Sequence, residues 1–177
     1  MEQEFLAAGF GGQGVLMIGQ LVALSAVDEN KFALFFPSYG PAMRGGTANC
    51  IVIIGDKPIG SPILNEHEHV IVMNNPSFTK FEPLVKKGGH LYVNSSLVSQ
   101  KSTRTDIQVH YIDANDIAGQ IGANVAANIV MLGSLLKASH FSSLETAEKA
   151  IQKKFSAKGD KVVQINLSAL KAGYEKA

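Results

Sequence analysis

The stretch Gly9-Phe10-Gly11-Gly12-Gln13-Gly14 decides the fold because it separates two segments of different periodicity. Before it, Gln3 to Phe10 is an apolar run typical of a buried strand. After it, Val15 to Ala26 repeats apolar residues at helical spacing. A strand, a tight glycine turn and a helix in this order form the opening unit of an α/β fold.

The same alternation continues along the chain. Further strands are predicted at residues 31–36, 47–54, 69–73, 89–93 and 107–112, and a helix at residues 76–87. Beyond Asp113 the pattern is helical, with helices at residues 125–137, from a capping box Ser142-x-x-Glu145 to about Phe155, and at residues 161–174. We therefore expect a single Rossmann-like α/β domain over residues 1–177. It should have a parallel or mixed sheet with helices on both faces and a helical C-terminal part from about residue 113.

Composition and charge exclude several functions. The net charge is +1 with both signs interspersed, so the chain lacks the basic surface that binds nucleic acid. Cys50 is the single cysteine, which excludes an internal disulfide and an iron–sulfur cluster held by this chain alone, because such a cluster usually takes four thiolates. The start Met-Glu-Gln-Glu lacks a secretory signal, and no apolar run approaches about 18 residues. We expect a cytoplasmic protein without membrane contact.

The glycine cluster is a candidate phosphate site. Gly9, Gly11 and Gly14 have the spacing G-x-G-x-x-G between a strand and a helix, where backbone N–H groups and the helix N-terminus can hold phosphate. The residues predicted to contact a phosphate-bearing ligand are Gly11, Gly12, Gln13 and Gly14. A competing interpretation is that the glycines only let the helix pack closely on the sheet, and both remain open at this point.

A second shaped loop runs from Pro37 to Gly46, where glycine and proline are too frequent for a helix or a strand. Arg44 among glycines can reach a phosphate or carboxylate with both arms of its guanidinium. The residues predicted to form an interface or active-site loop are Ser38, Tyr39, Arg44, Gly45, Gly46 and Thr47.

These motifs together resemble the γ subunits of 2-oxoacid:ferredoxin oxidoreductases. The chain has G-F-G-G-Q-G at residues 9–14, P-S-Y-G-P-A-M-R-G-G-T-A-N at residues 37–49, and A-N-V-A-A-N-I-V-M-L-G-S-L-L at residues 123–136. The resemblance spans residues 5 to about 136. Two long motifs that occur together are far more specific than one glycine spacing.

The resemblance implies a subunit of a complex that converts a 2-oxoacid and coenzyme A to an acyl-CoA and carbon dioxide. Within the family the 2-oxoglutarate type is favoured. Thiamine diphosphate, magnesium, iron–sulfur clusters and coenzyme A are expected in the complex, with none of the cofactors held by this chain alone. The implied partners are α and β subunits, a ferredoxin-like δ subunit, and ferredoxin or flavodoxin as electron acceptor. No catalytic and no metal-ligating residue is predicted here, so the isolated chain should be inert.

Two other functions remain as alternatives. One is a nucleotide-binding or redox-sensing module that uses the Gly9–Gly14 loop for NAD. Asp28 and Glu29 are near the expected position of an acidic ribose ligand, but they follow the first helix and not the second strand, so this interpretation is incomplete. The other alternative is a purely structural partner domain.

The histidines and the cysteine carry no predicted chemistry. Glu66-His67-Glu68-His69 offers metal-ligating groups, but no third partner is visible, and a solvated loop is the favoured interpretation. The remaining histidines are predicted to be isolated at the edges of elements: His90, His110 and His140. Cys50 lies within an apolar strand pattern and is predicted to be a small buried hydrophobe.

Overall fold

The computed structural model describes residues 2–40 and 46–176. Arg44 and Gly45, both predicted in the second loop, lie outside the described residues. The strands are β1 (Glu2–Phe10), β2 (Phe32–Tyr39), β3 (Thr47–Gly55), β4 (His67–Val72), β5 (Val85–Asn94) and β6 (Gln108–Ile112). The α-helices are α1 (Val15–Asp28), α2 (Asn75–Phe81), α3 (Ala114–Gln120), α4 (Ala127–Ser139), α5 (Leu144–Phe155) and α6 (Asp160–Lys176). Three short 3-10 helices are η1 (Glu82–Leu84), η2 (Asn124–Ala126) and η3 (Ser156–Lys158).

The strands form one six-stranded mixed sheet in the order β2-β3-β1-β4-β5-β6. Strands β1, β4, β5 and β6 are parallel neighbours, whereas β3 is antiparallel to both β1 and β2. The chain leaves β1 toward β2 on one side and later returns to place β4 on the other side of β1. The carboxyl end of β1 is therefore a topological switch point, where α/β sheets commonly bind ligands.

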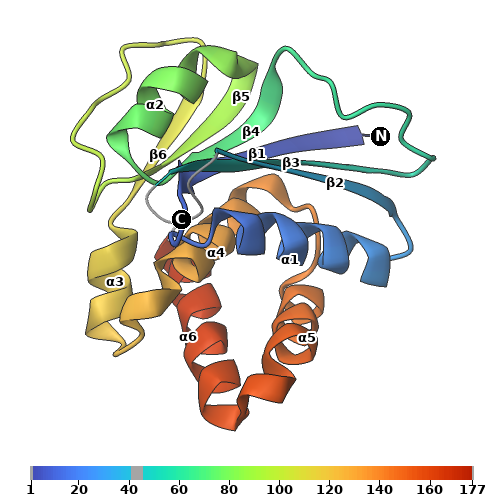
Figure 1. The fold of residues 1–177 in the computed structure, drawn as a ribbon, viewed down its shortest axis with the longest axis vertical. Coiled ribbons are helices and arrows are strands. Elements are labelled where there is room, and N and C mark those ends of the chain that lie inside the picture. The colour runs from blue at the N-terminus through green and yellow to red at the C-terminus, as the bar shows by residue number, and fades with distance from the viewer. Residues whose placement is uncertain (1, 41–45, 177) are drawn as a thin grey trace.

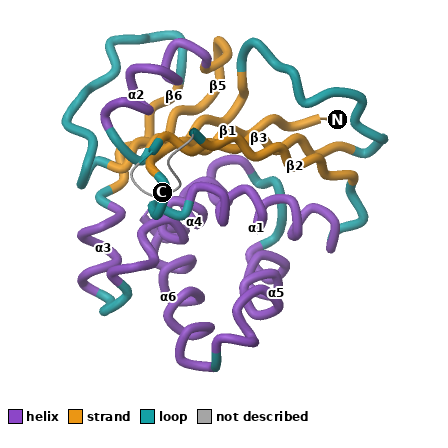
Figure 2. The backbone as a smooth tube through the Cα atoms, in the orientation of Figure 1, coloured by secondary structure: helices purple, strands orange, loops and turns teal. Residues whose placement is uncertain are grey.

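Helices cover both faces of the sheet, as the sequence predicts (Figure 1). On one face, α1 and α4 lie against the strands and α5 and α6 extend away from them, whereas α2 lies on the other face (Figure 2). Alternate residues of β1 divide between the two cores: Phe5 and Ala7 pack with α1 and α4, and Leu6 and Ala8 pack on the side of α2. This period of two explains the unbroken apolar run of a strand buried on both faces. No helix in the described ranges is long and apolar enough to cross a membrane.

Several predicted boundaries are wrong. Strand β2 continues through Pro37 and Ser38 to Tyr39, which were predicted in the second loop, and these residues pair with β3. Proline is tolerated there because β2 is an edge strand of the sheet.

The helix expected at residues 76–87 ends at Phe81, continues as η1 to Leu84, and gives way to strand β5 at Val85. Pro83 lacks the N–H group that an α-helix needs there, and Val85 is buried in the core beside α2.

The capping residue of α5 is also displaced by one position. Ser143, not Ser142, caps the helix, because its Oγ accepts a hydrogen bond from the Thr146 N–H at 3.1 Å. The Ser142 hydroxyl instead donates to Glu29 at 2.8 Å, and Glu145 pairs with Lys149. The sequence pattern indicated the right turn but not which of two adjacent serines faces the helix.

Candidate functional site

The glycine loop joins β1 to α1 at the switch point of the sheet. Gly12 and Gly14 have φ angles of 101° and 75°, in the left-handed region that favours glycine. Gly14 is the N-cap of α1, and within the described chain no side chain caps this helix. The N-terminus of α1 therefore keeps its partial positive charge directed out of the loop.

The structure brings the two loops predicted from the sequence together. The Gly11 N–H donates to the Gly46 carbonyl at 2.8 Å, and the Gly40 N–H donates to the Thr47 carbonyl at 2.8 Å. Strand β3 carries Thr47 beside Phe10 of β1. The strand ends that flank the second loop thus lie next to the glycine loop, with Ser38 of β2 and Thr47 of β3 exposed.

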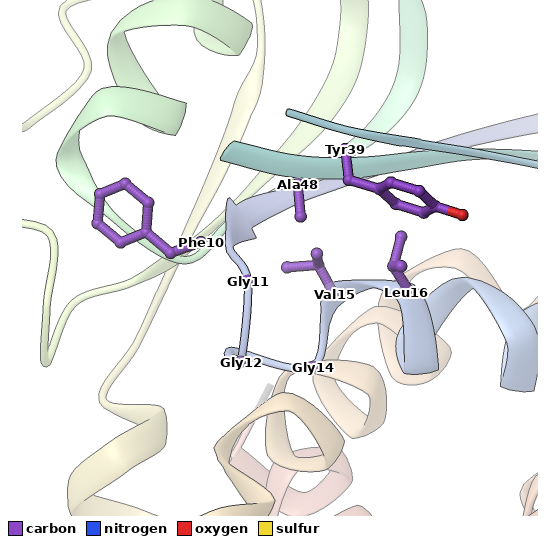
Figure 3. Close-up of a pocket in the computed structure, with 8 residues that line it drawn as sticks. All are labelled: Phe10, Gly11, Gly12, Gly14, Val15, Leu16, Tyr39 and Ala48. Atoms are coloured by element: carbon purple, nitrogen blue, oxygen red, sulfur yellow. The ribbon is translucent and has the colours of Figure 1, made fainter. Parts of the chain in front are cut away.

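An apolar cavity of about 420 Å³ opens between the two loops (Figure 3). Tyr39 and Ala48 face it from the sheet, and Val15 and Leu16 face it from α1, whereas the Phe10 ring points away from these four side chains (Figure 3). The remaining lining residues are Gly11, Gly12 and Gly14. The sequence did not indicate the apolar wall, because Val15, Leu16 and Ala48 carry only the periodicity of a helix and a strand.

A second, more polar cavity of about 310 Å³ lies on the other side of Gly12. Carboxamides dominate its polar lining: Gln13, Asn115, Asn124 and Asn128. Leu97 and Val125 contribute exposed apolar side chains, and Val125 is 93% exposed. Among the described residues, neither cavity is lined by a charged side chain.

Gln13 and Asn128 hold the loop from within the protein. The Gln13 carboxamide bonds to Phe10, Met73 and Asn74, and so turns inward instead of toward the apolar cavity. The Asn128 Nδ2 donates to the Gly14 carbonyl at 3.2 Å. A Cβ at Gly14 would lie 2.4 Å from that nitrogen, so any other residue would displace the Asn128 carboxamide and would also be strained at the positive φ. Asn128 belongs to the third motif of the sequence, but its role at the loop could not be foreseen.

Cys50 is buried beneath α1, as predicted. Its thiol donates to the Val15 carbonyl at 3.3 Å, and burial raises the pKa of the thiol to about 12. A thiol with this pKa stays protonated at neutral pH, so Cys50 acts as a packing residue.

The predictions for four histidines are wrong: His67, His69, His90 and His110. His67 and His69 are buried in β4, with 2% and 3% exposure, and not in a solvated loop. His69, His90 and His110 lie across the neighbouring strands β4, β5 and β6 with Tyr92 among them, and their rings form stacked pairs.

Hydrogen bonds also join these side chains. The His90 Nδ1 and His110 Nε2 share a hydrogen bond of 3.0 Å, and His69 bonds to the Tyr92 hydroxyl at 3.2 Å. The sequence did not predict this cluster, because the residues are about 20 positions apart and only the pairing of the strands brings them together. In the described ranges, no group of three or more His, Cys, Asp or Glu side chains is arranged to hold a metal ion.

The switch point, the glycine loop and the adjoining cavities define a Rossmann-like module that presents its site at the carboxyl ends of β1 and β4. Residues 4–176 match the family described as pyruvate ferredoxin/flavodoxin oxidoreductase, and the chain belongs to that family. The resemblance drawn from the three motifs is thereby confirmed.

Individual relatives agree with this assignment. The chain is 35% identical to the 2-oxoglutarate synthase subunit KorC of Methanocaldococcus jannaschii, covering 100% of this chain and 95% of that one. It is 36% identical to the ketoisovalerate oxidoreductase subunit VorA of Methanothermobacter marburgensis, covering 94% of this chain but only 34% of that protein. The chain thus spans about a third of the length of VorA.

Solved structures share the fold. The γ subunit of a keto/oxoacid ferredoxin oxidoreductase from Geobacter sulfurreducens superposes with a TM-score of 0.86 at 30% identity, covering 99% of this chain and 96% of that one. The 2-oxoglutarate:ferredoxin oxidoreductase of Magnetococcus marinus, solved with 2-oxoglutarate, coenzyme A and succinyl-CoA, gives a TM-score of 0.90. At 19% identity, with 99% of this chain and 31% of that chain covered, this second likeness shows the fold alone.

Proposed function

We propose that this chain is the γ subunit of a cytoplasmic 2-oxoacid:ferredoxin oxidoreductase and that its glycine loop receives coenzyme A. One observation carries the proposal: the N-terminus of α1 has no side-chain cap, and the loop that precedes it, with Gly12 and Gly14, borders an apolar cavity of about 420 Å³. The family membership and the KorC and VorA relatives support it. The favoured substrate is 2-oxoglutarate, with which the 35% identity to the KorC subunit over nearly its whole length agrees.

The two parts of the site suit two parts of coenzyme A. Backbone N–H groups at the loop and the positive end of the α1 dipole would bind its pyrophosphate without a charged side chain. The apolar walls made by Val15, Leu16 and Tyr39 would hold the pantetheine arm and exclude water around it. The role of this chain is therefore to bind and orient the acyl acceptor.

The redox chemistry would come from other subunits. Thiamine diphosphate with magnesium supplies decarboxylation when bound, and iron–sulfur clusters carry electrons to ferredoxin or flavodoxin. The residues of this chain do not fit a cluster, because Cys50 is its single cysteine and is fully buried. We propose that α, β and ferredoxin-like δ subunits hold these groups.

The second loop would face those partner subunits. Ser38, Tyr39 and Thr47 are exposed beside the glycine loop, and Gly46 is bonded to Gly11. We propose that Arg44 and Gly45 extend this surface and that the Arg44 guanidinium pairs with an anion from outside the chain.

The NAD interpretation finds little support in the site. An NAD-binding fold of this type places an acidic residue at the end of the second strand, to bond the ribose. Here β2 ends at Ser38 and Tyr39, and Asp28 is the last residue of α1.

Reconstitution tests the proposed function. The purified chain alone should not reduce a dye with 2-oxoglutarate and coenzyme A, and activity should appear when the partner subunits are added. Replacing 2-oxoglutarate with pyruvate or 2-oxoisovalerate in the same assay tests the substrate. Activity of the isolated chain, after contaminating subunits are excluded, would contradict the division of labour, and strong binding of NADPH or NADH by the chain would favour the alternative.

A further inference from the structure

Gln13 occupies a site built for its side chain. Its Oε1 accepts hydrogen bonds from the Phe10 N–H at 2.7 Å and from the Asn74 Nδ2 at 2.8 Å. Its Nε2 donates to the Met73 carbonyl at 3.1 Å. Both oxygen lone pairs and one of the two N–H groups are thus used within the protein, so little of the carboxamide remains for a ligand.

Gly9 leaves the space that this carboxamide fills. A Cβ at Gly9 would lie 2.7 Å from the Gln13 Oε1 and 3.0 Å from the Met73 Cβ. Any side chain at this position would displace the Gln13 amide. The first glycine of the G-x-G-x-x-G spacing therefore makes room for Gln13 and not for a phosphate.

The carboxamide ties both ends of the turn that carries Gly12. The Gln13 N–H donates to the Phe10 carbonyl at 3.1 Å, while the Gln13 Oε1 accepts from the Phe10 N–H. Between these two residues, Gly12 is exposed, and a Cβ there would have no atom within 4 Å. The turn is thus held on its inner side and open on its outer side.

Asn74 connects this turn to a rigid part of the fold. Its side chain is buried, with the residue 5% exposed, and its Oδ1 caps α2 by accepting from the Ser77 N–H at 2.9 Å. Its Nδ2 is the donor to Gln13. Gln13 therefore fastens the glycine loop to the start of α2, at the carboxyl end of β4.

We propose that Gln13 is a positioning residue, which, with Asn74, holds Phe10–Gln13 in the shape that receives the phosphates of coenzyme A. This inference rests on the proposed function of the loop. Without the carboxamide, the loop would have to be ordered when coenzyme A binds, and affinity would fall. The chemical step takes place elsewhere, so the turnover number should change little.

Two variants in the reconstituted complex test the proposal. Gln13→Met keeps the length of the side chain and removes its hydrogen bonds. Asn74→Ser keeps a good N-cap for α2 but cannot reach Gln13. We expect each to raise the KM for coenzyme A by roughly five- to tenfold, the scale of ordering a loop on binding, with kcat changed by less than about twofold. The double variant should be no worse than Gln13→Met alone, because the residues act through one contact.

Asn75→Ser is the matched control. This variant also replaces an asparagine with serine, at the next position in the chain. It removes a hydrogen bond to Ser99 and none to the glycine loop. A wild-type KM in Asn74→Ser would overturn the proposal, because the variant removes the contact between Asn74 and Gln13 that is proposed to hold the loop. Fully additive effects would overturn it as well. If Gln13→Met fails to assemble, Asn74→Ser decides alone. A wild-type KM in Gly12→Val would instead remove the proposed function of the loop.

Discussion

Two regions of the molecule, the glycine loop and the contact between α4 and α6, require glycine for different physical reasons, as Gly12 and Gly173 show. Gly12 lies at the tip of the loop with a φ of 101°, and a Cβ there would meet no atom within 4 Å. Gly173 lies inside α6, where a Cβ would be 1.9 Å from the Val130 carbonyl oxygen of α4. The loop uses backbone freedom and empty space, whereas the layer between the helices uses the absence of a side chain to pack two backbones together.

The comparison separates stability from binding. Substitutions in the packed layer should change the free energy of unfolding, and substitutions around the loop should change the affinity for coenzyme A. A residue that crossed this division would show that the two regions are coupled.

The largest effect is expected from Gly173→Ala. The new methyl group cannot fit against the Val130 backbone, so α6 must move away from α4, which should cost about 3 kcal/mol of unfolding free energy. Gly119→Ala is the control, because this glycine is exposed in α3 and a Cβ there would meet only the movable Asn124 side chain, at 3.3 Å. Alanine there should be neutral or stabilise by up to about 1 kcal/mol. Urea denaturation of the full chain measures both. Equal stability of the two variants would show that the α4–α6 contact adjusts freely.

The histidines of β4, β5 and β6 are part of the packed interior and should make the stability of the chain depend on pH. Burial, with the neighbouring His90 and His110, lowers the pKa of His69 to about 3. An unfolded chain has a histidine pKa near 6.5, so between about pH 6.5 and 3 the unfolded state binds the extra proton, and stability falls as pH falls. Between pH 6.5 and 4.5 the expected loss from His69 is about 2 kcal/mol.

His69→Gln measures this contribution. A glutamine amide can still reach the Tyr92 hydroxyl but does not titrate, so its stability should decline less steeply in acid. The nearby Glu68 carboxylate, 4.0 Å from the His69 Nε2, titrates in both proteins and cancels in the comparison. Parallel stability curves for the two proteins from pH 6.5 to 4.5 would contradict a buried neutral His69.

Gly12→Val tests the loop side of the comparison. The added side chain meets no atom, but the positive φ is strained for valine, and the branched group would stand between the two cavities. We expect the KM for coenzyme A to rise about tenfold, equivalent to about 1.4 kcal/mol, in a complex that still assembles. Gly159→Val is the matched control, because Gly159 has a φ of 93° and equally open surroundings but lies between η3 and α6. The connection from α5 to α6 is at the end of these helices that lies away from the sheet (Figure 1). An equal KM in both variants would assign the glycine to folding.

The sequence predicts the elements better than their contacts. Local periodicity indicated each strand, because a strand buried on both faces, such as β1, must be apolar throughout. The stacked His69, His90 and His110 depend on which strands become neighbours, and no local pattern carries that information. The site shows the same limit: the glycine motif located the loop, but the inward turn of Gln13 depends on Met73 and Asn74, about 60 positions away in the chain.

The smallest effect is expected at Tyr39, which forms an exposed wall of the apolar cavity. Its side chain is 61% exposed, so Tyr39→Ala removes contact area for the pantetheine arm without opening the core. Loss of a partly exposed apolar contact of this size should raise the KM for coenzyme A roughly threefold and leave the melting temperature nearly unchanged. Phe36→Ala provides the control, because Phe36 is an aromatic residue of β2 that is also half-exposed, at 50%, but does not line the cavity. Lower stability of Tyr39→Ala with a wild-type KM would contradict this prediction. Tyr39 would then contribute to the packing of the sheet and not to the binding of coenzyme A.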